Sequence, residues 1–231
     1  MRQIEPSQLT KATELAVFDI QSLSPYARKV DRSSEVVAAL AALPNLTTVT
    51  ARDLVDASVA TAVSQLKRVT TLSCGWPCYN RGPQRAIDGR RYIEEHNELL
   101  ATAAIGKQLT SLDVGDSVNS VGTAALLLGL PKLINLRIGI APPHDGDLPH
   151  SIAKASRTLR GVHFGFELGY GDWINSPGRV QPETIKANNT LALLLTALPV
   201  ELERLPILQC RVSAANVKRI AQLPAITDLE L

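Results

Sequence analysis

The stretch 130–138 reads Leu130-Pro-Lys-Leu133-Ile-Asn-Leu136-Arg-Ile138, and its pattern recurs along the chain. The apolar residues are separated by three, three and then two positions. The last step alternates with a period of two, which predicts a short β-strand with one buried face. The phrase has seven further copies, one of which carries an inserted residue: Leu9–Val17, Leu43–Ala51, Leu66–Cys74, Gly106–Val114, Ser156–Phe164, Leu198–Ile207 and Leu223–Leu231.

Segments with helical spacing precede most of these strands. We predict helices over Ser34–Leu43, Ser58–Leu66, Val121–Leu130, Leu148–Ser156, Glu183–Leu198 and Ala214–Leu223. Where the phrase begins with Leu-Pro, the proline should end the helix, because it drives the residue before it out of the helical region. The predicted N-caps are Ser33, Asp56, Asn119 and Ser213. A constant order of helix, turn and strand predicts an α/β fold with a parallel sheet, since parallel strands need crossover segments.

The phrase resembles the leucine-rich-repeat pattern L-x-x-L-x-L-x-x-N/C-x-L, whose first three apolar positions are met in every copy. This resemblance covers the chain from about Leu9 to Leu231. It implies a leucine-rich-repeat solenoid (horseshoe), with a parallel β-sheet on the concave face and helices on the convex face. Only Cys210 matches the ninth position, so we expect an irregular horseshoe without an asparagine ladder. The alternative is an ordinary doubly wound α/β domain, which would not need the same phrase before every strand.

The chain is expected to form one irregular leucine-rich-repeat domain, residues 1–231, of about eight strand units. Insertions are expected near 18–33, 76–91 and 167–182. Leu231 occupies a core position of the last copy with no capping element after it, and terminal repeats usually need a polar cover. We therefore expect a part of a longer protein, or an end that a partner subunit covers.

Composition narrows the classes of protein. Of the 231 residues, 45% are hydrophobic and 20% are charged, with a net charge of +2. This excludes a wholly disordered chain and a coiled-coil rod, and it argues against a dedicated nucleic-acid binder. No apolar stretch approaches the ~20 residues that span a bilayer, and the first residues show no secretory leader. We expect a cytoplasmic protein without a membrane partner, which is compatible with delivery into a host cell.

The residues between the buried strand positions should project from the concave face. They are mostly small and polar, with isolated charges toward the middle of the chain. Such a surface favours protein recognition, in which a few anchor residues carry most of the binding energy. The predicted partner-binding residues are Arg52, Ser73, Asp113, Arg137 and His163 on the face, with Tyr170 and Trp173 on a rim insertion.

Three other motifs suggest chemistry but have simpler explanations. Cys74-Gly-Trp-Pro-Cys78 has three residues between its cysteines, whereas the redox motif has two. The two His and two Asp of His144–His150 resemble divalent-ion ligands, but Pro and Gly there predict an exposed loop that enters a helix. The glycines of Gly161–Trp173 do not open a helix directly after a strand, so they predict no phosphate site. We predict no catalytic residues, no metal site and no cofactor.

The favoured function is therefore a non-enzymatic scaffold that displays a polar concave face to a protein partner. The alternative is the substrate-recognition region of a larger enzyme, as in bacterial effector ubiquitin ligases with leucine-rich repeats, which this chain resembles in outline. Neither reading predicts the identity of the partner or the oligomeric state.

Overall fold

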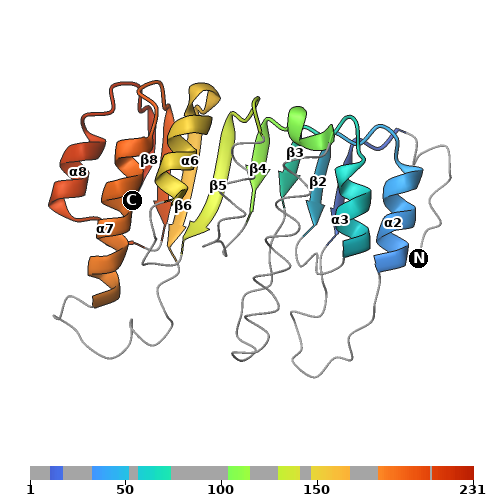
Figure 1. Ribbon diagram of the computed structural model, residues 1–231, viewed down its shortest axis with the longest axis horizontal. Coiled ribbons are helices and arrows are strands. Elements are labelled where there is room, and N and C mark those ends of the chain that lie inside the picture. Colours follow the sequence, from blue (N-terminus) through green and yellow to red (C-terminus); the bar gives the residue numbers. More distant parts are fainter. Residues whose placement is uncertain are drawn as a thin grey trace.

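The computed structural model describes residues 11–17, 33–51, 57–73, 104–114, 130–140, 147–166, 182–208 and 210–231. Within them the chain forms an eight-stranded, all-parallel sheet in which the strands follow one another in sequence order (Figure 1). The predicted α/β class with a parallel sheet is confirmed. The strands are β1 (Glu14–Val17), β2 (Thr48–Ala51), β3 (Thr71–Ser73), β4 (Ser111–Asp113), β5 (Asn135–Ile140), β6 (Gly161–Phe166), β7 (Arg204–Leu208) and β8 (Asp228–Glu230).

The described helices lie together on one side of the sheet (Figure 1). They are α2 (Ser33–Ala42), α3 (Ala57–Ser64), α6 (Asp147–Ala155), α7 (Pro182–Ala197) and α8 (Ala214–Ile220), with 3-10 turns η2 (Ala104–Lys107) and η3 (Ser156–Thr158). None of the helices in the described ranges is long and apolar enough to cross a bilayer.

Two helices end where the proline rule predicts. Helices α2 and α7 end one residue before the Leu of a Leu-Pro pair, whereas α8 ends at Ile220, short of the predicted Leu223. Ser213 caps α8 as predicted, because its Oγ accepts a hydrogen bond from the Asn216 backbone N–H at 3.3 Å. Asp56, Asn119 and most of the predicted helix Val121–Leu130 lie outside the described residues.

The repeated phrase also sets the register of the sheet. The central residues Leu15, Val49, Leu72, Leu112, Leu136 and Val162 are successive Cα partners, and Leu205 pairs with Leu229. Between β6 and β7, Gly161 faces Arg204 and Phe164 faces Ile207, which places Val162 opposite Leu205. From β2 to β7 the central side chains are at most 2% exposed, so the core lies between the sheet and the helices.

The last phrase is the exception. Leu231, predicted to be a core residue, is 56% exposed, and the central Leu229 is 43% exposed. In the described residues β8 is an edge strand that pairs only with β7. An apolar side chain at the central position is covered by the helices and by the units on both sides of it, and within the described residues β8 has a neighbouring strand on one side only.

A ladder of backbone hydrogen bonds ties the turns before the strands to one another. In each turn one carbonyl oxygen accepts two N–H groups of the next turn, at 2.8–3.1 Å. The acceptors are Thr13, Thr47, Thr70, Thr110, Ile134, Arg160 and Glu203. The hydroxyls of Thr47, Thr110 and Thr227 donate to the same carbonyls at 3.2–3.3 Å. We call this set of hydrogen bonds the turn ladder. It links neighbouring units in a chain whose sequence offers no asparagine ladder.

A polar pair joins α7 to α8. Asn216 is only 2% exposed, and its side-chain amide donates to the Asn188 backbone carbonyl at 2.9 Å and to Asn188 Oδ1 at 3.1 Å. Asn188 in turn donates to the carbonyl of Arg211 at 2.8 Å. The buried amide is thereby satisfied, which removes the cost of burying an unpaired polar group.

Candidate interaction surface

One face of the sheet is turned away from the helices, and we call it the open face. It carries the residues on either side of the central strand positions. In β3 and β4 these residues are half-buried while the central Leu72 and Leu112 are buried. This alternation follows from the two-residue period of a strand, with its apolar side against the helices.

Four of the predicted binding residues lie side by side on the open face. Ser73 pairs in register with Asp113, Asp113 with Arg137, and Arg137 with His163. We call these four residues the central row. They cross the adjacent strands β3 to β6, a span of roughly 14 Å at the usual spacing between strands. Neighbours in this row are separated by up to 40 positions in the sequence, yet they form one continuous line of polar side chains.

Asp113 is the electrostatic centre of this row. Its Oδ2 accepts a hydrogen bond from Ser73 Oγ at 3.1 Å and lies 3.8 Å from Arg137 Nη1. The ion pair is longer than a charge-assisted hydrogen bond, and the two side chains are 43% (Arg137) and 24% (Asp113) exposed. A pair of this kind contributes about 0–1 kcal/mol to stability. It holds one end of the guanidinium near Asp113 while the Arg137 side chain stays partly exposed.

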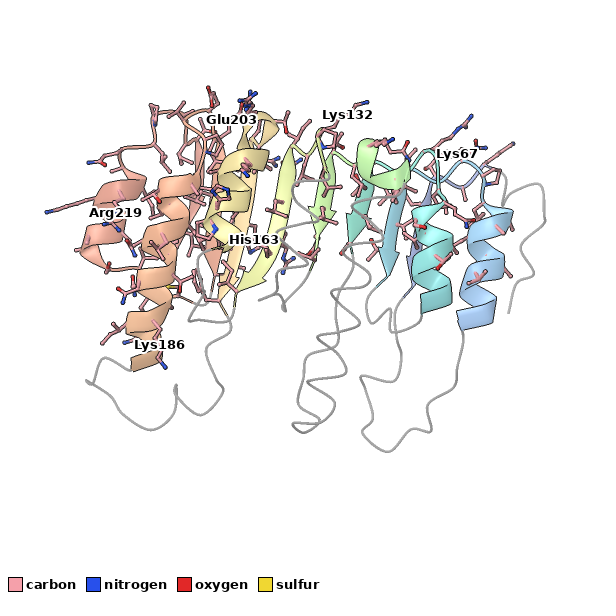
Figure 2. The ribbon with its side chains drawn as sticks, viewed as in Figure 1. Lys67, Lys132, His163, Lys186, Glu203 and Arg219 are labelled. Carbon is pink, nitrogen blue, oxygen red and sulfur yellow. The ribbon has the colours of Figure 1, made fainter. Side chains whose placement is uncertain are left out.

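The far end of the row is formed by His163. It lies on β6 beside Arg137 and is labelled in Figure 2; the residue is half-buried, and its Nε2 atom is buried. Two residues further along the strand, a Cβ built on Gly165 would meet no heavy atom within 4 Å. Gly139 lies at the same level on the neighbouring strand β5 and is buried. The open space is thus confined to the position of Gly165.

A second row of residues escaped the sequence analysis. Asn135, Gly161 and Arg204 are successive register partners on β5, β6 and β7. The Arg204 guanidinium reaches across Gly161 and donates to Asn135 Oδ1. Gly161 is one of the residues beside the central strand positions, which were expected to project from the concave face, but it is buried under this hydrogen bond. A Cβ there would lie 2.8 Å from Asn135 Oδ1. The sequence does contain a sign of this contact. When the copies of the phrase are aligned, Gly161 stands between Asn135 and Arg204 at the same position.

The remaining predicted residues fall elsewhere. Arg52, Tyr170 and Trp173 lie outside the described residues, as do Cys74 and Cys78. Of the predicted loop His144–His150, the described part starts with Asp147, which begins α6, and His150 is exposed in that helix. Among the described residues, no three His, Cys, Asp or Glu side chains are grouped so that they could hold a metal ion.

Cys210, the single match to the ninth consensus position, packs against the hydrophobic core. Burial raises the pKa of its thiol to about 11, because desolvation disfavours the thiolate. At neutral pH the thiol is protonated, and only the thiolate is a good nucleophile or metal ligand. Cys210 is therefore a packing residue.

Comparison with known proteins adds no family to these observations. No protein-family model matches the chain, and no curated protein matches it.

Proposed function

We propose that this protein is a non-enzymatic recognition module that binds a protein partner on the open face of the sheet. The observation that carries the proposal is the central row, in which Ser73 and Arg137 both contact Asp113 on adjacent strands. Arg137 is the anchor, because a partly exposed guanidinium with five N–H donors suits a carboxylate or carbonyl of a partner.

Rigid display is the mechanism that we infer. The turn ladder holds neighbouring strands in one register, and the core side of β2 to β7 is closely packed. Ordering side chains on binding costs about 0.5–1.5 kcal/mol each, and a surface already held in place avoids much of this cost. The parallel strand order and the phrase in every unit also support our proposal of a single irregular leucine-rich-repeat horseshoe with the open face as its concave side.

The experiment uses the whole chain as an immobilised bait in a lysate of its source cells. Wild type is compared with Arg137→Glu and with a control of equal charge change, Lys186→Glu. The exposed side chain of Lys186 lies on α7, on the helical side of the sheet (Figure 2). Retained proteins are quantified by mass spectrometry, and the strongest candidate is purified for a direct Kd measurement.

We expect one protein that is retained by wild type and by Lys186→Glu and whose Kd rises about tenfold or more with Arg137→Glu. That loss corresponds to at least about 1.4 kcal/mol, in the range of an interface anchor. Retention that is unchanged by Arg137→Glu would contradict binding through the central row.

A further inference from the structure

We propose that the turns before the strands form a second docking surface, which binds an extended acidic segment of a polypeptide. Its residues are six exposed cations, which we call the basic ridge: Lys11, Lys67, Arg68, Lys107, Lys132 and Arg157. The ridge is separate from the central row and goes beyond the proposed function, because it lies at the edge of the sheet where all the strands begin.

The fold lines these cations up. Every strand is parallel to its neighbour, so every turn that leads into a strand lies at the same edge of the sheet. Figure 2 shows Lys67 and Lys132 along this edge. The cations occur four or five residues before the central position of their units, in five of the first six turns. The turn ladder sets successive turns about 4.8 Å apart, so the ridge runs over roughly 24 Å.

The charge of the ridge is uncompensated. The described turns of these six units contain no Asp or Glu, and within the described residues no ion pair joins a ridge cation to a carboxylate. The next turn reverses the sign with Glu201 and Glu203. A row of like charges attracts an anion. The ridge therefore creates a positive potential along the edge of the sheet, which ends at the turn that contains Glu201 and Glu203.

The spacing and the neighbouring side chains favour a polypeptide over a nucleic acid. An extended strand of about seven residues covers 24 Å and directs every second side chain to one face. Pro44, Pro131 and Ile134 are exposed between the cations and offer apolar contact to a peptide. Single-stranded nucleic acids bind through aromatic side chains on which bases stack, and the turns of the ridge contain none.

The test is a fluorescence-anisotropy titration of the full chain with a labelled peptide of about twelve residues that alternates Glu and Ser. The matched probes are a Gln-Ser peptide and a thymidine oligonucleotide of the same charge as the Glu-Ser peptide. The ridge variant is Lys67→Glu/Lys107→Glu/Lys132→Glu. Its control, Lys154→Glu/Lys186→Glu/Lys218→Glu, changes the net charge equally on the exposed surfaces of α6, α7 and α8.

We expect saturable binding of the Glu-Ser peptide, a Kd that rises at least about tenfold in the ridge variant, and a change of less than about twofold in the control. Binding should weaken as salt is raised, and the Gln-Ser peptide should not bind. Arg137→Glu should leave peptide binding unchanged, which separates this proposal from the proposed function. Absence of saturable binding, equal weakening by both triple variants, or tighter binding of the oligonucleotide would each overturn it.

Discussion

At the scale of single residues, two glycines of β6 differ in whether a larger side chain would fit. Gly165 has open space where a Cβ would stand, whereas Gly161 lies under the Arg204–Asn135 hydrogen bond. Replacing Gly by Ala at a compatible backbone position stabilises a protein by about 0.4–1 kcal/mol, because the unfolded chain loses freedom. The same change at Gly161 must displace Asn135 and forfeits a hydrogen bond of about 1 kcal/mol.

We therefore expect Gly165→Ala to be more stable than Gly161→Ala by about 1 kcal/mol, as measured by urea unfolding. As a control, both substitutions are made in an Asn135→Ala background. The atom nearest to the new Cβ at position 161 is then absent, so the two variants should be equally stable. Equal free energies of unfolding for the two single variants would show that the bridge over Gly161 does not constrain the site.

Cys210 gives a prediction about pH. Its pKa is about 11 in the folded protein, above the value of about 8.5 for an unfolded thiol. Below pH 8.5 the thiol is protonated in both states and its contribution to stability is fully present. Between about pH 8.5 and 11 the unfolded thiol ionises first, so this stability is lost as the pH rises.

The measurement is the free energy of unfolding of wild type and Cys210→Ala from pH 7 to 11. The variant lacks the thiol, so wild type should lose more stability than Cys210→Ala over the alkaline range. The difference between the two proteins should be constant below about pH 8. Parallel curves up to pH 11 would mean that the Cys210 thiol titrates as it does in water.

At the scale of elements, the turn ladder is what converts separate units into one sheet. Thr110 contributes a hydroxyl that donates to the Thr70 carbonyl at 3.2 Å in a partly buried turn, and Thr227 makes the equivalent bond to Glu203 at 3.3 Å in an exposed turn. Water competes more strongly for the exposed bond. The two positions are therefore a matched pair that differ in burial.

Replacing each threonine by valine keeps its shape and removes its hydroxyl. We expect Thr110→Val to lower the free energy of unfolding by about 1 kcal/mol and Thr227→Val to change it by a few tenths of that amount. Chemical unfolding monitored by circular dichroism measures both. A larger loss at Thr227 than at Thr110 would contradict this role of the ladder.

At the scale of the whole molecule, stability should vary along the stack, because each strand pairs only with the strands before and after it. Leu136 and Leu229 hold the same position in the phrase, but Leu136 is buried between two strands and Leu229 is 43% exposed at the edge. Leu136→Ala should cost about 2–5 kcal/mol and Leu229→Ala less than about 1.5 kcal/mol. Amide hydrogen exchange should likewise be slower in β5 than in β8. Similar losses in the free energy of unfolding for both substitutions would mean that the edge strand β8 contributes as much to stability as the central strand β5.

The recurrent phrase was sufficient to predict the strand positions and the parallel sheet, and the structure pairs the central residues of the phrase in register. This was possible because a slip of one residue would turn Leu112 or Leu136 from the core to the open face, so the apolar pattern allows one alignment. Ser73, Asp113, Arg137 and His163 could be assigned to one face for the same reason. The exposure of Leu231 could not be predicted from the phrase, because it depends on whether another strand lies against β8.

Local apolar periodicity decides, within each unit, which side chains face the helices and which face outward. Which outward-facing residues touch one another depends on how the separate units pack together. The contact between Ser73 and Asp113 and the reach of Arg204 over Gly161 to Asn135 join residues 40 and 69 positions apart. They depend on the side-chain conformations that neighbouring strands permit at a spacing of about 4.8 Å. No local pattern encodes such conformations, because they arise when separate units are packed against one another.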